Sequence, residues 1–504
     1  MADTEAAAPQ LKGDAIGFVD ALVIGLAATS PAYSLAAVIG PIAALVGVYA
    51  PGVLLASFVP MALIATAFLY LNRVDQDCGT TFSWVTRAMG PWAGWIGGWA
   101  ITMTGVLVIG SLADVGIRFT LYMVGADSWG DNAWVRMPLA ILLIIVMTWL
   151  CVLGTDIAAR LQNALIFGQV AALLVFAVVA IAQAYAGNSS LEEIRPGFDW
   201  LNPFGEGGAA LSSGLLLGVF AYWGWESAVN LSEETRDGAS APGRAGVWST
   251  FILVVTYIAV AYAVVAFAGT QWLSDNAGEE EFVFAYIAGE VLGGWDWVLL
   301  FAVATSAIAS TQTTIIPASR TGLSMARRYA LPHTFARIHP RHRTPDVSTW
   351  WVAAIAIVWY VGVYQISENA LFDSLTALSL LIAFYYALTG VACAVYYRRH
   401  LTESVKNFLL IGVGPLIGSA LLVWLLVLSI RDMSDPENSY SGQSWLGVGP
   451  PLVIGVGILI AGIVVMLIWR TQDSRFWQER AGVADPDIVH GRKTATSDPA
   501  DLEG

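Results

Sequence analysis

Residues 28–34 read Ala-Thr-Ser-Pro-Ala-Tyr-Ser and interrupt the first long apolar segment of this 504-residue chain near its middle. Residues 220–226, which read Phe-Ala-Tyr-Trp-Gly-Trp-Glu, interrupt the sixth apolar segment in the same way. Backbone that leaves helical geometry at membrane depth is tolerated only where it is buried in protein or lines a cavity. A matched pair of interrupted segments is typical of secondary transporters built from inverted repeats. The pair therefore predicts a protein that moves a small solute.

The composition is that of an all-α polytopic membrane protein. Hydrophobic residues make up 57% of the chain and charged residues 12%, whereas a soluble domain has about 25% charged residues. Apolar runs of about 18 residues or more predict twelve membrane spans in a lipid bilayer. They lie at about 16–44, 51–71, 91–123, 137–153, 161–186, 209–232, 245–270, 295–325, 348–366, 371–397, 407–430 and 447–469.

The basic residues predict the orientation, because Lys and Arg are retained on the cytoplasmic side. With the N-terminus inside, only Arg118, Arg136, Arg195 and Arg431 lie near the outer side, which leaves 20 of the 24 basic residues inside. We expect a multi-pass protein of the cell membrane with both termini in the cytoplasm. Residues 1–15 form a cytoplasmic leader without a signal peptide, and residues 471–504 read as a disordered cytoplasmic tail.

The first interruption carries the start signal of a helix. Ser30 fits the N-cap and Pro31 the first helical position. A helix that restarts at mid-membrane presents free amide donors and a positive dipole end, which suit a carboxylate of a solute. A simple proline kink is the alternative interpretation.

The second interruption combines a flexible residue with aromatic ones. Gly224 permits backbone conformations that are closed to other residues, and the freed carbonyls before it could accept bonds from an ammonium group. The surrounding aromatic residues could stack over that cation or form a gate; some of them could instead face lipid. The aromatic residues in question are Phe220, Tyr222, Trp223 and Trp225.

Further polar residues stand inside apolar segments. A carboxylate at the depth of Glu226 is costly, so it normally faces the bundle interior and has a function. It could carry a proton, pair with a substrate amine, or only bond the broken backbone. Asp114 and Arg118 lie one helical turn apart and predict a neutralised pair. Hydroxyls of the eighth segment, among them Ser310 and Thr311, could coordinate sodium or could simply allow close helix packing.

Three motifs resemble the amino acid–polyamine–organocation (APC) family of permeases. Residues 222–228, Tyr-Trp-Gly-Trp-Glu-Ser-Ala, resemble the family's signature in segment 6. Residues 77–91, which end in Gly-Pro, resemble the loop after segment 2, and residues 318–345 resemble the loop after segment 8. The likeness covers about segments 1 to 10.

The resemblance implies a LeuT-like fold, a five-plus-five inverted repeat with two extra C-terminal helices and with helices 1 and 6 broken. The core would span residues 16–397, with repeats at about 16–186 and 209–397, and residues 398–470 would form helices 11 and 12. It further implies alternating-access transport of an amino acid or related amine, by proton or sodium symport or by exchange. The family's first break is usually Gly-x-Gly, where this chain has residues 29–31. Several proton-coupled members have a Lys in segment 5, where this chain has Gln169.

The candidate site follows from these patterns. The expected substrate-binding residues are Thr29, Ser30, Pro31, Ala32, Tyr33, Phe220, Ala221, Tyr222, Trp223 and Gly224. The expected gating residues are Phe220, Trp223 and Trp225, and the expected coupling residues for a proton or sodium are Glu226, Ser310 and Thr311.

Other functions remain as alternatives. A sensor or channel could use the same scaffold, and polyamine exchange is a further option. A membrane enzyme would usually show intramembrane clusters for a metal or a general base, but all five histidines fall in loops or the tail. The three cysteines, Cys78, Cys151 and Cys393, are too far apart to suggest a metal site. We expect no cofactor, no metal and no nucleic-acid partner, and a monomer or a homodimer.

Overall fold

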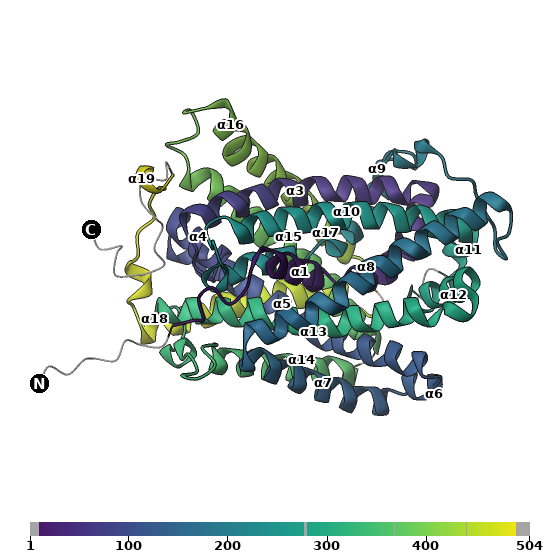
Figure 1. Cartoon of the computed structure of the whole chain (residues 1–504). Coiled ribbons are helices and arrows are strands. Elements are labelled where there is room, and N and C mark those ends of the chain that lie inside the picture. The colour runs from purple at the N-terminus through teal and green to yellow at the C-terminus, as the bar shows by residue number, and fades with distance from the viewer. Residues whose placement is uncertain (1–9, 277–279, 367, 440, 490–504) are drawn as a thin grey trace, which may run out of the picture.

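The computed structural model is almost entirely helical and describes residues 10–276, 280–366, 368–439 and 441–489. Its long helices lie side by side in one elongated bundle (Figure 1). Among the described residues, ten helical stretches are long and apolar enough to cross a membrane. One of them, Phe18–Val74, contains three successive helices. The expected number of twelve spans stays a prediction.

The helices follow one another along the chain as follows. In the first part they are α1 (Phe18–Thr29), α2 (Pro31–Val46), α3 (Ala50–Val74), α4 (Thr81–Met89), α5 (Pro91–Met123), α6 (Asp127–Gly130), α7 (Ala133–Leu153) and α8 (Thr155–Ala186). Then come α9 (Gly208–Ala221), the 3₁₀ helix η3 (Trp225–Glu234), α10 (Ala241–Ala268), α11 (Thr270–Asp275), α12 (Glu280–Leu292) and α13 (Trp297–Arg327). The last are α14 (Asp346–Ile366), α15 (Glu368–Tyr396), α16 (Val405–Asn407), α17 (Gly414–Met433), α18 (Pro450–Gln472) and α19 (Pro486–Val489).

Two helix junctions have the backbone geometry that their residues dictate. Between α1 and α2, Ser30 has φ 56° and ψ 62°, in the left-handed region. Pro31 lacks an amide hydrogen, and its ring disfavours helical geometry at the residue before it. Between α9 and η3, Gly224 has φ 118°, a value that only glycine adopts readily. We call residues 28–31 the first break and residues 221–225 the second break.

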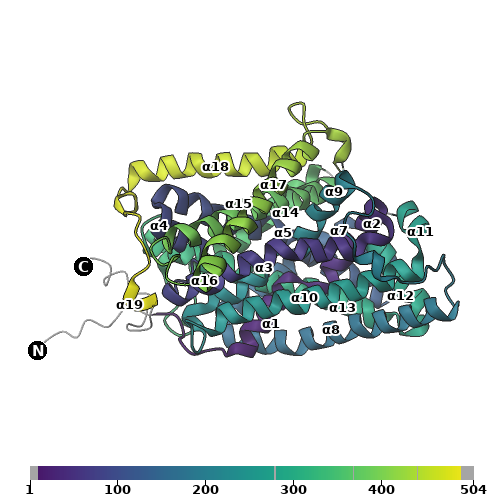
Figure 2. The same cartoon turned by 90° about the horizontal axis from the view of Figure 1, so that it is seen from above.

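Burial separates the central helices from the peripheral ones. The most apolar stretches of α5 and α13 are 83% and 78% buried inside the protein. Helix α13 packs along α5. The corresponding stretch of α18 is only 28% buried, and this helix runs along one edge of the bundle (Figure 2). Helices α5 and α13 therefore form the centre of the bundle, where both breaks are enclosed and a functional site is expected.

The two ends of the described chain lie at the same end of the bundle, which we call the terminal end (Figures 1 and 2). There Ile16 pairs with Thr235 in a short parallel bridge, which ties the chain before α1 to the end of η3. Residues 473–489, expected to be part of a disordered tail, pack here instead. Phe476 is 1% exposed, and burial of such a side chain stabilises a segment that composition alone makes look unstructured. Residues 1–9 of the leader and 490–504 of the tail lie outside the described residues.

Candidate functional site

The two breaks lie against each other in the middle of the bundle. A Cβ atom on Gly224 would lie 2.7 Å from the carbonyl carbon and oxygen of Ala28 and 2.8 Å from the amide nitrogen of Thr29. Real Cβ atoms do not approach backbone that closely, so glycine is required both for its φ and for this contact. The second break thus packs directly on the backbone of the first.

Hydroxyl groups of α13 hold the first break. The Oγ atoms of Ser30 and Ser306 lie 2.9 Å apart, and the Ser310 hydroxyl donates to the carbonyl of Ala28 at 2.9 Å. Thr311 donates within its own helix, to the carbonyl of Ala307. Of the two α13 residues expected to couple an ion, Ser310 therefore contacts the first break directly, whereas the Thr311 hydroxyl bonds to α13.

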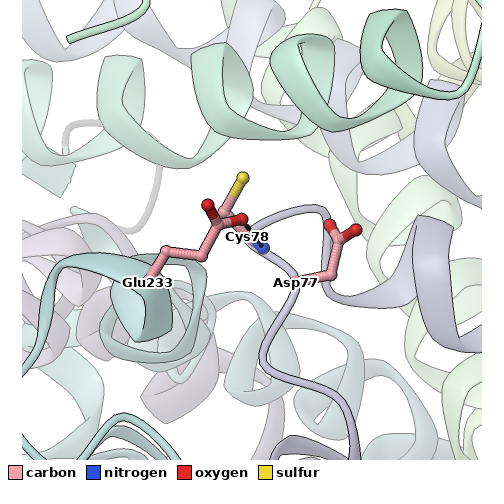
Figure 3. Close-up of side chains that lie close together, drawn as sticks. All are labelled: Asp77, Cys78 and Glu233. Atoms are coloured by element: carbon pink, nitrogen blue, oxygen red, sulfur yellow. Dashed lines mark hydrogen bonds between the residues drawn. The ribbon is translucent and has the colours of Figure 1, made fainter. Parts of the chain in front are cut away.

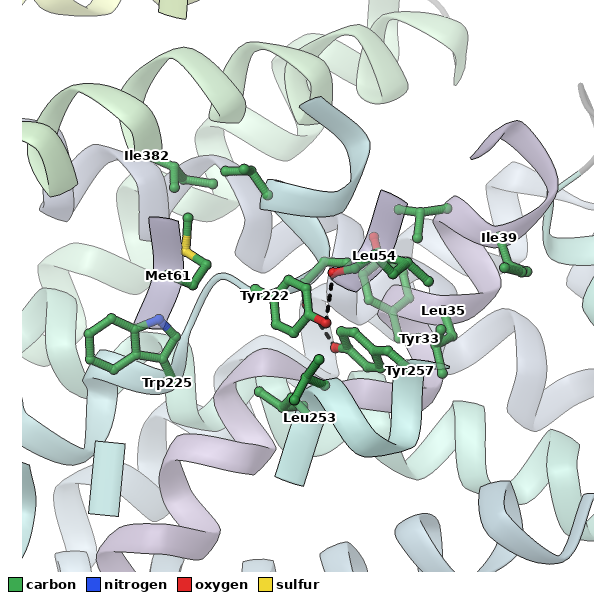
Figure 4. Close-up of a cluster of buried hydrophobic side chains, with 14 of the residues drawn as sticks. Tyr33, Leu35, Ile39, Leu54, Met61, Tyr222, Trp225, Leu253, Tyr257 and Ile382 are labelled. Carbon is green, nitrogen blue, oxygen red and sulfur yellow. Dashed lines mark hydrogen bonds between the residues drawn. The ribbon is translucent and has the colours of Figure 1, made fainter. Parts of the chain in front are cut away.

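Two backbone carbonyls at or beside the second break, those of Phe220 and Ala221, are already bonded within the protein. The Tyr257 hydroxyl of α10 donates to the carbonyl of Ala221 at 2.7 Å. The backbone amide of Trp223 donates to the carbonyl of Phe220 at 3.0 Å. The Tyr222 hydroxyl donates to the carbonyl of Leu54 on α3 at 3.1 Å. Figure 4 shows Tyr222 beside Tyr257 within a cluster of buried apolar side chains. The structure thus places the Tyr222 side chain in the core of the bundle.

Glu226, at the start of η3, accepts hydrogen bonds from neutral groups. Tyr385 donates to its Oε1 at 2.5 Å and Tyr386 to its Oε2 at 2.5 Å, both from α15. The backbone amide of Gly224 donates to Oε2 at 3.2 Å. The indole Nε1 of Trp223 in turn donates to the Tyr385 hydroxyl at 2.5 Å. A chain of hydrogen bonds therefore joins the second break to α15 through this carboxyl group.

Trp225, the other tryptophan of the second break, is fully buried. Its ring lies 5.0 Å from that of Phe68 on α3 and 5.7 Å from that of Tyr386. Edge-on and tilted contacts of this kind stabilise a packed aromatic cluster. Of the predicted gating residues, only Trp223 lines the cavity described next.

A small cavity lies at the contact of the two breaks. Its lining includes Ala28, Trp223, Gly224, Glu226, Ser227 and Thr314. The cavity has a volume of about 10 Å³, which holds about one water molecule. Residues 29–33, expected to cradle a carboxylate, do not line it. This cavity is too small for a solute of the size of an amino acid.

Tyr257, Tyr385 and Tyr386 were not among the expected site residues. The adjacent pair of tyrosines inside the tenth apolar segment was the available signal, because buried hydroxyls need hydrogen-bond partners. Gln169 of α8, singled out because the resemblance implies a lysine there, is buried and donates to Thr305 of α13 at 3.5 Å.

A second buried polar cluster lies between α5 and α7. Arg136 is fully buried, and its Nε donates to both carboxylate oxygens of Asp114 at 3.1 and 3.0 Å. The Tyr360 hydroxyl also donates to Asp114, at 2.5 Å. Arg118, one helical turn away, was the expected partner of Asp114; Arg136, which binds Asp114 here, lies 22 residues away along the chain.

Asp77, Cys78 and Glu233 form a third polar cluster (Figure 3). It lies in the loop after α3 and near the end of η3. One potential ligand atom from each residue lies within 4.8 Å of the others. The Arg327 guanidinium, however, donates to both oxygens of Glu233 at 2.9 and 2.8 Å. Burial raises the pKa of the Cys78 thiol well above its usual value. The Glu233 carboxylate is therefore already paired with a guanidinium inside this cluster.

Asp77 is held in its charged form at the same place. Burial by itself would raise its pKa, but the charge of Arg328 and the Ser324 hydroxyl, which donates at 2.5 Å, hold the pKa below its usual value. The cluster thus joins the loop after α3 to the ends of η3 and α13 through charged groups.

A comparison with protein families gives the assignment. Residues 16–465 match the family model described as amino acid permease. The chain belongs to this family. Its members carry solutes across membranes, so the protein is a multi-pass membrane transporter rather than an enzyme.

Two curated relatives illustrate the range of this similarity. The permease is 26% identical over 424 residues to the human Asc-type amino acid transporter 1, an alignment that covers 82% of this chain and 74% of the relative. It is 22% identical over 415 residues to the methylthioribose transporter of Bacillus subtilis. This alignment covers 79% of this chain and 82% of the relative.

A solved structure confirms the predicted fold class. The permease resembles the crystal structure of MhsT in complex with L-phenylalanine, with a TM-score of 0.54 at 14% sequence identity. The match covers 81% of this chain and 98% of MhsT. At this identity the likeness shows the fold, which is the LeuT-like fold expected from the sequence.

Proposed function

We propose that this permease is a secondary active transporter that carries an amino acid or a related organic amine across the cell membrane by alternating access. One observation carries the proposal: a buried carboxyl group, Glu226, stands at the contact of the two breaks, and Tyr385, Tyr386 and a backbone amide are its bonding partners. A buried carboxylate with neutral partners calls for a cation or a proton to balance it. An ammonium group of the solute and a transported proton are the two species that suit this position.

Two features of this site favour one class of substrate. One relative is named for amino acids and another for methylthioribose, so the family alone leaves the solute open. A carboxylate facing a cavity favours a solute with a positive charge. A solute's own carboxylate would meet the first break, where α2 begins with a positive dipole end. Together these two features favour an amino acid over a neutral sugar.

Coupling to a proton is favoured over coupling to sodium. The Ser310 hydroxyl donates directly to the Ala28 carbonyl, which ties α13 to the first break. Gln169 carries an amide that does not titrate, which leaves Glu226 as the group at the breaks that can take up and release a proton. Transport in this proposal rises with an inward proton gradient and is unchanged when sodium is replaced by choline.

The orientation follows from the basic residues. Both termini lie in the cytoplasm in this proposal, so the terminal end of the bundle is its cytoplasmic end. The bundle then opens alternately at the terminal end and at the opposite end, with the two breaks between them.

Uptake into proteoliposomes tests the proposal. Purified permease is reconstituted, and entry of a panel of radiolabelled amino acids and amines is measured with and without a proton gradient, in sodium and in choline. Saturable uptake that unlabelled substrate competes away is expected for at least one amine-bearing solute. Binding without flux would instead assign a sensor, and flux that does not saturate would assign a channel. Uptake of methylthioribose alone would overturn the amine assignment.

A further inference from the structure

The segment after α18 crosses the terminal end of the bundle and contacts several helices there. We call Asp473–Val489 the C-terminal strap. It runs from the end of α18 past α4 and reaches the residues that follow α15 (Figure 2). It carries only two short helical turns, so contacts with the rest of the bundle are what hold it in place.

One aromatic side chain anchors the strap. Phe476 is 1% exposed and stacks on Phe82 of α4, with ring centroids 5.5 Å apart. Met325 of α13 and Ala330 belong to the same apolar cluster. Next to this anchor, the ring of Trp477 lies 5.0 Å from that of Trp92 at the start of α5. Burial of a phenylalanine in such a cluster is a substantial stabilising contribution.

Backbone hydrogen bonds fix the far part of the strap. The amide of Gly482 donates to the carbonyl of Arg87 on α4 at 2.7 Å, and the amide of Ala484 donates to the carbonyl of Tyr396 at the end of α15 at 3.0 Å. A salt bridge of 3.2 Å joins Glu479 to Arg328, the residue after α13. The strap therefore joins α4, α13 and α15, whose ends are far apart in the sequence.

Helix α4 connects the strap to η3, the helix that carries Glu226. From α4, Arg87 forms a salt bridge of 2.7 Å with Asp75, in the loop after α3. In that loop, the Cys78 amide donates to Glu233 at 3.0 Å, and Asn230 donates to the Cys78 carbonyl at 3.0 Å. Glu233 and Asn230 are residues of η3, which begins at the second break. A continuous set of contacts thus runs from the strap through α4 and this loop to η3.

We propose that the C-terminal strap is a latch that holds the terminal end of the permease closed, by keeping α4 and the loop after α3 packed against η3. Release of the strap frees this loop and lets η3 move away. The inference rests on the proposed function in one respect, namely that transport requires the terminal end to open.

The natural cysteines of the chain supply the test. Cys78 lies in the loop that the latch holds and is fully buried, as are Cys151 and Cys393 within the bundle. The rate at which a membrane-impermeant maleimide labels each cysteine is measured on the full-length permease in lipid nanodiscs, where both faces are accessible. Three variants are compared with the natural chain: Phe476→Ala, a chain that ends after Gln472, and Gln478→Ala as the matched control, since Gln478 is an exposed residue of the strap.

Labelling of Cys78 is expected to be roughly tenfold faster in Phe476→Ala and in the shortened chain, because loss of a buried aromatic anchor shifts a local closed–open equilibrium strongly. Gln478→Ala is expected to match the natural chain, and Cys151 and Cys393 are expected to stay protected in every variant. Unchanged labelling of Cys78 in both anchor variants would overturn the proposal. Equal exposure of all three cysteines would overturn it as well, since the strap would then serve folding as a whole.

The labelling experiment needs no substrate, so its outcome is independent of the solute. If proteoliposomes show no uptake of amines while Cys78 becomes accessible in the anchor variants, the proposed function fails and the latch stands. If uptake is observed while Cys78 labelling does not change, the latch fails and the proposed function stands.

Discussion

Glu226 is the residue on which the proposed chemistry depends. Its two oxygens accept three hydrogen bonds from neutral donors, an arrangement that suits a charged carboxylate well. A proton on Glu226 would turn one of these acceptors into a donor and force a tyrosine hydroxyl to turn. The protonation state of this one group is therefore expected to change the contact between the second break and α15.

Replacement of Glu226 by glutamine tests its role as proton carrier. The amide keeps the size of the side chain and cannot take up a proton in the physiological range. We expect Glu226→Gln to abolish or strongly alter the pH dependence of uptake and to lower its rate by roughly tenfold, the effect of about 1.4 kcal/mol. Uptake by proteoliposomes between pH 5 and 8 measures both. Glu206→Gln, at an exposed carboxylate before α9, is the control, and a variant Glu226→Gln with the natural rate and pH profile would make the carboxylate structural.

Ser30 offers a second test at the scale of one residue. It is buried in the left-handed region, where a β-branched side chain is strongly disfavoured and costs about 1–3 kcal/mol. We expect Ser30→Val to weaken substrate binding by roughly tenfold, whereas Ser30→Gly keeps the backbone conformation and much of the affinity. Thermal-shift titration with the transported solute gives the affinity, and the elution profile of the unliganded protein shows whether folding is intact. Equal affinities in both variants would remove the first break from the site.

At the scale of elements, the decisive feature is the contact between the two breaks. The second break lies on the backbone of the first because Gly224 has no Cβ atom, and hydroxyls of α13 hold the first break from the other side. Any relative movement of η3 and α1 must change this contact. The two breaks therefore form a joint rather than two independent kinks.

Gly224→Ala tests the joint. A Cβ atom at this position meets backbone at 2.7 Å, and φ near 118° is closed to alanine. We expect the variant to lose most of its uptake, by roughly tenfold or more. The matched control is Gly289→Ala in α12, where a Cβ atom meets nothing within 4 Å and alanine favours the helix. Normal uptake by Gly224→Ala would show that the breaks do not need to touch.

At the scale of the whole molecule, the ends of the described chain gather at one end of the bundle. The chain before α1 pairs with the end of η3, and the C-terminal strap packs on α4 and α15. This end carries the charged clusters around Asp77 and Glu233. The opposite end, by contrast, carries the loops that precede α9 and α18.

The orientation of the molecule is tested with epitope tags. A tag after residue 504 is expected to be reached by antibody only after the cell membrane is permeabilised, because basic residues hold the terminal end in the cytoplasm. A tag inserted after Ser441, between α17 and α18, is expected to be reached in intact cells. Antibody access to the first tag in intact cells would reverse the proposed orientation.

Sequence-based expectations and the structure agree best for features that the local backbone determines, such as helix ends. Twelve apolar runs led to the expectation of an all-helical membrane bundle, and the structure has the LeuT-like fold. Pro31 and Gly224 predicted where regular helix ends, because the properties of both residues act on the adjacent backbone and need no distant partner. The same is true of Glu226, whose cost in an apolar segment is visible without any structure.

What the sequence alone determined is therefore the class of the protein and two places, at Ser30 and Gly224, where regular helix ends. Only the tertiary structure decided the partners. Tyr385 lies 159 residues after Glu226, whose carboxylate it contacts. Arg136 binds Asp114. Phe476 stacks on Phe82 and so anchors a segment whose composition predicts disorder. Such contacts depend on how helices are rotated and packed against one another, and that arrangement is a property of the whole folded bundle rather than of any local stretch of chain.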